Sequence, residues 1–332
     1  MSIPAKKMTL GFIPANRGCF SADLAAKMRG ETVRAMERFG IDVVVPSPDQ
    51  TKVGCVENRQ EAEVCAALFR QHEVKGIVIG AVNFGDEQAA AWTVRKSPTV
   101  PVLIFGCQED ERLTRRTARR DSFCGLLSIG EAMRQIEARY TVARRPIGFP
   151  SDPAFADDLD WFVRVCRVVD GIRNARYGQI GIRPNAFWTC RFDEKQLQRL
   201  GPTTVVLDLS EAIAGCNAIG DDDPEVPATV AAINQYADAS AVASLALVKS
   251  AKLEVFLRRW GKANGIDGFG IQCWTSIQNN YGVCSCATMS RLGDEGVPCA
   301  CESDILGTLS MHAAMLASGT PAALADWNNL HN

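Results

Sequence analysis

Two carboxylates near the end of the chain stand at a spacing that suits a divalent cation. Glu302 closes a short predicted strand, Val297–Glu302, and Asp326 closes a second one, Ala322–Asp326, with a helix predicted between them at Ile305–Ala317. In a strand–helix–strand unit the strands are parallel and often adjacent, about 4.8 Å apart. Both side chains are then expected at the carboxyl edge of one sheet, where open α/β sheets bind ligands. Oxygen ligands favour Mg²⁺ or Mn²⁺ over zinc.

The same two residues also have purely structural interpretations. Glu302 could stabilise the N-terminus of the helix that follows, which contributes about 0.3–1 kcal/mol. Asp326 could cap the turn formed by the residues Trp327–Asn329. Spacing alone leaves these alternatives open. The helix between the carboxylates has clear limits, because Ser303 or Asp304 can cap its start and Pro321 prevents its continuation.

The first half of the chain alternates short apolar strands with helices. The predicted strands are Met8–Pro14, Ile41–Val45, Lys75–Ala81 and Val100–Gly106, and the predicted helices are Ala22–Phe39, Arg59–Gln71, Asp86–Lys96 and Cys124–Tyr140. Strands that are apolar throughout, separated by helices, are typical of a parallel sheet covered on both faces. Neither a GxGxxG nor a GxxxxGK[ST] pattern is present, so a nucleotide site of those kinds is not indicated.

The second half repeats this alternation, and prolines mark a boundary before it. Three prolines fall within Pro146–Pro153, which predicts one domain over residues 1–150 and another over 151–332. The second domain is predicted to contain helices at Ala154–Asn174 and Asp238–Asn264 and strands at Ala175–Ile182, Val205–Leu209 and Gly268–Trp274. The fold class is therefore α/β, with two doubly wound domains, both with parallel sheets, the first of them flavodoxin-like.

Composition excludes several classes of function. The 332 residues carry a net charge of −2, and the arginine-rich run Arg112–Arg120 has no interleaved aromatics, so it is expected to be a solvated loop and not a nucleic-acid site. No apolar run is long enough to span a membrane, and the N-terminus lacks the apolar core of a secretory signal. Thirteen cysteines, an odd number, fit reduced thiols in a cytoplasmic protein.

The cysteine pairs Cys284-x-Cys286 and Cys299-x-Cys301 raise the question of a zinc or iron–sulfur site. Structural zinc prefers two residues between paired cysteines, and free cysteine behaves as a small apolar residue, so buried thiols are the favoured interpretation.

Several segments resemble the L-fucose/L-arabinose isomerase family. They are IQCWT at Ile271–Thr275, MSRLGDEG at Met289–Gly296, PCACESD at Pro298–Asp304, ALADWN at Ala323–Asn328, PANRG at Pro14–Gly18, VNFGDEQAA at Val82–Ala90, DSFCG at Asp121–Gly125 and a long stretch at Trp161–Pro184. The most specific of these similarities is the glutamate–aspartate pair at 302 and 326.

The resemblance implies an aldose–ketose isomerase that works through an ene-diol, with a divalent ion, usually Mn²⁺, held by a glutamate, an aspartate and a histidine. The first two correspond to Glu302 and Asp326, which would also act as acid and base. Arg17 and Gln272 resemble substrate-binding residues of the family, and Trp274 would offer an apolar face to the sugar. The sugar stays open among L-fucose, L-arabinose and D-arabinose.

The resemblance also implies a homo-oligomer, a trimer or hexamer, with sites between subunits that the loop Asn83–Gly85 would reach. The histidine ligand is expected from a C-terminal domain that would begin where this chain ends, at Asn332, so an incomplete site is expected; only His331 stands near Asp326. Two alternatives are a non-catalytic sugar-binding or regulatory α/β module, which needs no metal, and an inactive scaffold subunit.

Overall fold

The computed structural model describes residues 7–110 and 113–326, and the chain divides into two compact units between Val169 and Asp170. Each unit is built on one sheet in which every pair of neighbouring strands is parallel. The predicted fold class, α/β with parallel sheets, is confirmed.

The first unit has a five-stranded sheet in the order β2-β1-β3-β4-β5, which is the flavodoxin order. Its strands are β1 (Thr9–Ala15), β2 (Asp42–Val44), β3 (Gly76–Ala81), β4 (Val102–Cys107) and β5 (Thr141–Gly148). Its helices are α1 (Ala22–Arg38), η1 (Lys52–Gly54), α2 (Arg59–Gln71), α3 (Glu87–Lys96), α4 (Ser122–Gln135) and the start of α5 (Pro153–Arg173).

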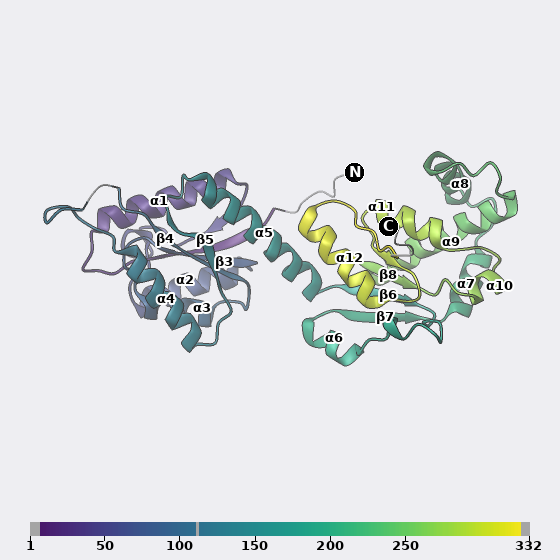
Figure 1. Cartoon of the computed structure of the whole chain (residues 1–332), viewed down its shortest axis with the longest axis horizontal. Coiled ribbons are helices and arrows are strands. Elements are labelled where there is room, and N and C mark those ends of the chain that lie inside the picture. Colours follow the sequence, from purple (N-terminus) through teal and green to yellow (C-terminus); the bar gives the residue numbers. More distant parts are fainter. Residues whose placement is uncertain (1–6, 111–112, 327–332) are drawn as a thin grey trace, which may run out of the picture. The chain divides into compact units, whose positions relative to one another are not determined.

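Helices cover both faces of this sheet because its central strands are apolar on both sides. Every residue of β3 and of β4 is buried. Helices α1 and α5 pack on one face, and α2, α3 and α4 pack on the other (Figure 1). The inner strands are therefore covered on both faces, and a ligand can approach them at the carboxyl edge of the sheet.

Strand β5 was not predicted, and it changes where the first unit ends. Its sequence, TVARRPIG, includes two arginines and a proline, which suit an exposed edge strand and not a buried one. The helix α5 then packs Phe155, Leu159 and Phe162 into the core beneath this sheet. The compact unit consequently reaches Val169, beyond the limit at residue 150 that the prolines indicated.

The second unit has a four-stranded sheet in the order β7-β6-β8-β9. Its strands are β6 (Arg176–Ile180), β7 (Thr203–Leu207), β8 (Gly268–Ile271) and β9 (Cys299–Ala300). Its further helices are η2 (Trp188–Cys190), α6 (Glu194–Leu200), α7 (Leu209–Ala218), α8 (Glu225–Tyr236), α9 (Ser244–Asn264), α10 (Ser276–Asn280), α11 (Cys286–Asp294) and α12 (Ile305–Ser318). Helices α7, α9 and α11 pack on one face, and α6 and α12 on the other (Figure 1).

The predicted strand at Ala322–Asp326 is wrong. The residues 321–326 belong to no strand, and the side chains from Ala323 to Asp326 are exposed. The neighbouring edge strand, β9, has only two residues, so it offers too few backbone groups for another strand to pair with. The helix before this segment ends as predicted, with Gly319 in the left-handed conformation.

A buried ion pair joins the helices α9 and α11. Arg291 donates from Nε to Glu254 Oε2 at 2.9 Å and from Nη2 to Oε1 at 3.1 Å. Glu254 is 1% exposed and also accepts from Arg258. A buried carboxylate is tolerated only when it is paired and hydrogen-bonded, so these contacts hold α11 against α9. Because β9 follows α11 in the chain, they also determine where the chain enters β9.

No helix among residues 7–110 and 113–326 has the length and apolar character needed to cross a bilayer.

His312 lies in α12 and packs against the sheet of the second unit. Its Nδ1 lies 3.0 Å from the Tyr177 hydroxyl, and the two rings meet edge to face. Burial lowers the pKa of His312 below its ordinary value and raises that of Tyr177. The histidine is therefore a neutral packing residue at pH 7.

Acidification should destabilise the second unit through His312. Below about pH 6.5 the unfolded chain binds a proton at this histidine while the folded chain does not, so the free energy of unfolding falls as the pH drops towards the lower folded pKa. Urea unfolding between about pH 7 and pH 5 should show a shallower loss for His312→Gln than for the parent. The exposed His72→Gln serves as the control, and an equal slope in all three proteins would contradict the assignment.

Candidate functional site

The strands β6, β8 and β9 end at one level, which brings their following residues together. Ile180 is in register with Ile271, and Gly270 with Ala300. The turn after β9 is tied to both neighbours: Ser303 N donates to Ile271 O at 3.1 Å, and Ser303 Oγ donates to Ile180 O at 3.2 Å. These bonds place Glu302 at the carboxyl edge of the sheet, as predicted from its position after a strand.

Glu302 and Ser303 both have left-handed backbones, each with φ 54°. Such a conformation costs a non-glycine residue about 1–3 kcal/mol and persists only where the surroundings impose it. Here the surroundings are the two bonds from Ser303 and a further one from Asp304 N to Cys301 O at 3.0 Å. In the second unit, Glu302 and Ser303 are the described non-glycine residues with a left-handed backbone, and Glu302 is the residue predicted to bind a metal.

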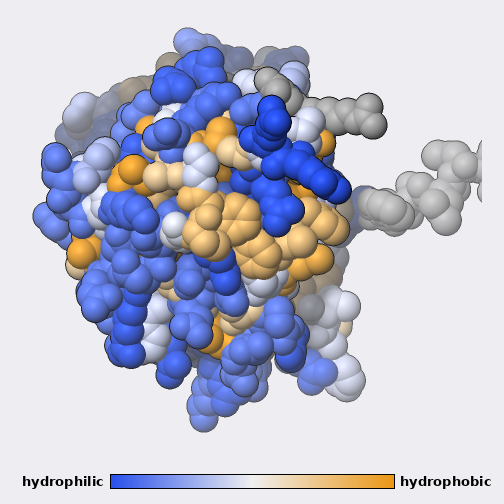
Figure 2. All heavy atoms as spheres, turned by 90° about the vertical axis from the view of Figure 1, so that its left-hand side faces the viewer, coloured by the Kyte–Doolittle hydropathy of each residue, from blue (hydrophilic) through white to orange (hydrophobic). Residues whose placement is uncertain are grey.

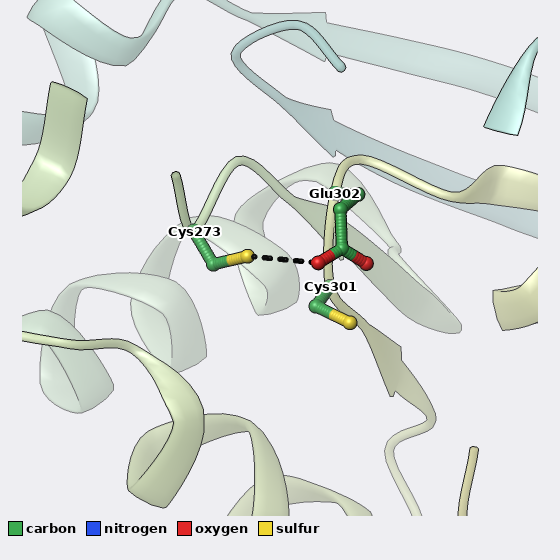
Figure 3. Close-up of side chains that lie close together, drawn as sticks. All are labelled: Cys273, Cys301 and Glu302. Atoms are coloured by element: carbon green, nitrogen blue, oxygen red, sulfur yellow. Dashed lines mark hydrogen bonds between the residues drawn. The ribbon is translucent and has the colours of Figure 1, made fainter. Parts of the chain in front are cut away.

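Two thiols lie beside the Glu302 carboxylate, and they were not predicted as site residues. Cys273 Sγ donates to Glu302 Oε1 at 3.6 Å, and the donor atoms of Cys273, Cys301 and Glu302 all lie within 4.8 Å of one another (Figure 3). Cys273 follows Gln272, and Cys301 precedes Glu302, so both thiols are adjacent in sequence to predicted site residues. That adjacency at two parallel strand ends was the signal that could have revealed them.

The two thiols affect each other's protonation. A hydrogen bond from Cys301 lowers the pKa of Cys273, an effect that burial opposes. The same hydrogen bond and burial both raise the pKa of Cys301. Cys273 is therefore the thiol of this pair that ionises more readily.

Gln272 and Trp274 line a cavity of about 510 Å³ at the same edge of the sheet. Gln272 Oε1 accepts from Ile182 N at 3.0 Å, so its amide is held at the cavity wall. Trp274 is 52% exposed and its ring meets that of Phe187 edge to face, with centroids 5.5 Å apart. The structure therefore brings together two of the three predicted substrate-binding residues, with Arg183 on the same wall.

Asp326 lies in the exposed segment that follows α12. Pro321–Leu324 line a cavity of about 420 Å³ together with Cys301 and Met311. The Leu324 side chain lies against Gly307, in the first turn of α12, where a Cβ would come within 3.0 Å of it. The segment therefore runs back from the end of α12 towards its start, the end at which Glu302 lies.

Arg17, the third predicted substrate-binding residue, follows β1 in the first unit. Its guanidinium is ion-paired with Glu87, donates from Nε to Gly85 O at 2.8 Å and stacks on Phe84 with Cζ 4.5 Å from the ring centroid. Asn83 Oδ1 accepts from Arg17 N at 3.0 Å. The predicted loop Asn83–Gly85 and the arginine thus form one polar assembly at the carboxyl edge of the first sheet.

An apolar surface is exposed on the first unit. Figure 2 looks onto this unit and shows an apolar patch with hydrophilic side chains along several of its sides. Phe123 is 58% and Leu127 is 56% exposed on α4, whose first turn packs closely on the backbone of Phe84 through Gly125. A cluster of exposed apolar side chains with a polar rim is typical of an interaction surface.

The residues present suit a divalent cation at Glu302. Within residues 7–110 and 113–326, no lysine or arginine forms an ion pair with the Glu302 carboxylate, which accepts a hydrogen bond from the Cys273 thiol. A half-buried carboxylate without a cationic side-chain partner can accept a metal ion as counter-charge. Of the described histidines, His312 is bonded to Tyr177 and His72 lies in the other unit, while His331 lies outside the described residues.

Comparison with known proteins identifies the family. The N-terminal domain of the fucose/sulfoquinovose isomerase family matches residues 11–173. Similar curated proteins are the sulfoquinovose isomerases of Priestia aryabhattai (22% identical over 325 residues) and Alkalicoccus urumqiensis (25% over 330 residues), each matching 96% of this chain and 69% of its own length. That of Clostridium sp. (strain MSTE9) is 24% identical over 258 residues, which is 75% of this chain and 55% of that protein. Residues 11–173 of this chain therefore correspond to the N-terminal domain of the fucose/sulfoquinovose isomerase family.

The predicted family is therefore confirmed in its broad outline, and the chain is an aldose–ketose isomerase by class. A C-terminal domain that supplies a histidine stays a prediction.

Replacement of Glu302 should reveal the strain in its backbone. At φ 54° glycine is favoured over alanine by about 1–2 kcal/mol, so Glu302→Gly should unfold at a higher urea concentration than Glu302→Ala. In the middle of α12 the order reverses, and the exposed Ala314→Gly should lose about 1 kcal/mol. If Glu302→Ala proves as stable as Glu302→Gly, the left-handed turn does not exist in solution.

Proposed function

We propose that this chain isomerises an aldose to its ketose with Mn²⁺ held by Glu302 and Asp326, and that its substrate is a sulfonated hexose such as sulfoquinovose. The observation that carries the proposal is Glu302: a carboxylate that pairs with no lysine or arginine of the described residues and stands on a strained turn at the carboxyl edge of a parallel sheet. The relatives named sulfoquinovose isomerase supply the substrate class.

The position of Asp326 supports its role as the second ligand. The segment that carries it returns past Leu324 to the first turn of α12, and Glu302 lies just before that turn. Asp326 is two residues beyond Leu324 and exposed, so its carboxylate is free to turn towards the same edge. A strand is therefore not required for the pair to share an ion.

The chemistry follows from carboxylates held beside a sugar. A bound Mn²⁺ would polarise the carbonyl of the open-chain sugar. A carboxylate within reach of C1 and C2 removes the proton from C2 while the oxygen on C1 gains one, which gives an ene-diol. Return of the proton to C1 and loss of the proton from the oxygen on C2 yield the ketose. Glu302 and Asp326 are proposed as this acid–base pair.

The cavity lined by Gln272 and Trp274 is proposed to hold the sugar. The Trp274 ring offers an apolar face, and the Gln272 amide offers a donor to a hydroxyl. Arg183 is proposed to bind the sulfonate, since its guanidinium lies on the same wall and is held by the carbonyls of Pro184 and Asn185 at 3.0 Å each. Arginine suits a fixed anion with several acceptor oxygens.

We also propose that the chain acts as a homo-oligomer, in keeping with the trimer or hexamer expected from sequence. The exposed Phe123 and Leu127, beside the Arg17 assembly, are the proposed contact surface on the first unit.

Removal of either carboxylate should weaken Mn²⁺ binding. Glu302→Gln and Asp326→Asn are each expected to lower the affinity by about a hundredfold, as seen in the electron paramagnetic resonance signal of free Mn²⁺, because each removes a charged ligand. The exposed Glu211→Gln and Asp222→Asn are the matched controls. Unchanged binding in both site variants would contradict the proposal and favour a sugar-binding module.

The substrate class can be tested through Arg183. With sulfoquinovose, Arg183→Gln should raise KM by about tenfold, whereas with L-fucose it should change KM little, because only the first sugar carries the anion. Arg199→Gln, on the exposed side of α6, is the control. Product formation is followed by nuclear magnetic resonance in D₂O, where an ene-diol route incorporates deuterium at the carbon that receives the proton. Absence of conversion of every aldose tested would refute the activity.

A further inference from the structure

The cluster of Cys273, Cys301 and Glu302 offers a donor set different from the oxygen ligands of the proposed reaction. Its three ligand atoms come from the ends of two neighbouring strands, β8 and β9, and all lie within 4.8 Å of one another (Figure 3). We propose that these three side chains form a site for a thiophilic divalent cation, Zn²⁺ or Cd²⁺. This proposal does not depend on the proposed isomerase activity.

The distance between the Cys273 sulfur and the Glu302 oxygen agrees with tetrahedral coordination. Zinc binds thiolate sulfur at about 2.3 Å and carboxylate oxygen at about 2.0–2.2 Å, which puts neighbouring donors about 3.5–3.8 Å apart. The sulfur of Cys273 lies 3.6 Å from Glu302 Oε1. Three protein ligands leave a fourth position for water, so the site is of the open kind.

Once the two thiols ionise, their negative charge and that of Glu302 require a cation as counter-charge. Cys273 is 3% exposed, and within the described chain no cationic side chain is paired with Glu302. Binding of one cation displaces one proton from each thiol, so two protons are released and the ion is held by two thiolates and a carboxylate. In a cluster of thiols that only fill space, a carboxylate beside them would be an unneeded desolvation cost.

Glu302 would be shared between the soft and the hard cation. A thiophilic ion takes Glu302 together with two sulfurs, whereas Mn²⁺ is proposed to take Glu302 with Asp326. The two ions then exclude each other at one carboxylate. Inhibition of the isomerase by Zn²⁺ or Cd²⁺ follows, and this consequence alone depends on the proposed function.

Cadmium provides a direct probe, because a bond between thiolate and Cd²⁺ gives an ultraviolet charge-transfer band. The full chain is used with its four exposed cysteines, Cys19, Cys124, Cys284 and Cys286, replaced by serine, which removes surface thiols. Titration with Cd²⁺ after anaerobic reduction should show the band saturating at one equivalent. Cys273→Ser and Cys301→Ser, made separately, should each weaken binding by about a hundredfold.

A buried cysteine away from the proposed site provides the matched control. Cys216→Ser, in α7 of the same unit, should leave the titration unchanged. A band that is absent, or that persists unaltered in both Cys273→Ser and Cys301→Ser, would overturn the site. Because the protein is reduced before the titration, an absent band cannot be explained by a disulfide between Cys273 and Cys301. Mn²⁺ binding measured on the same variants separates this outcome from a failure of the isomerase proposal.

Discussion

The two hydrogen bonds from Ser303 to the ends of β6 and β8 determine what this edge of the sheet can do. They hold the backbone of residues 302 and 303 in a conformation that neither residue would adopt alone. As a result, the carboxylate of Glu302 stands beside the thiols of Cys273 and Cys301 instead of lying along the start of α12. Without this turn the parallel strands would still form, but their ends would present no converging ligands.

Hard and soft donors meet at a single carboxylate. The segment after α12 brings an aspartate back towards this edge, and the strand ends supply the sulfurs. The ion that is bound then depends on which side chains bind it together with Glu302. A second carboxylate favours Mn²⁺, whereas thiolates favour Zn²⁺. The ions available in the cell would thus affect the proposed chemistry as directly as the sugar does.

Sequence patterns predicted the parallel sheets well because the inner strands β3 and β4 are apolar at every position and need no long-range information. They failed at β5, whose arginines and proline suit an edge, and at the supposed strand before Asp326, where the two-residue β9 offers no partner. The position of Glu302 after a strand could be predicted. Its contact with Cys273, twenty-nine residues earlier, could not, because it depends on the order β8-β9 within the sheet.

The buried pair of Glu254 and Arg291 ties the course of the chain before β9 to a residue on a different helix. Arg291 sits in α11, and only a short loop separates that helix from the strand that leads to Cys301. A neutral residue at position 254 would leave Arg291 charged in the core, and a neutral residue at position 291 would leave Glu254 with Arg258 as its cationic partner. Among related proteins, positions 254 and 291 are therefore expected to covary.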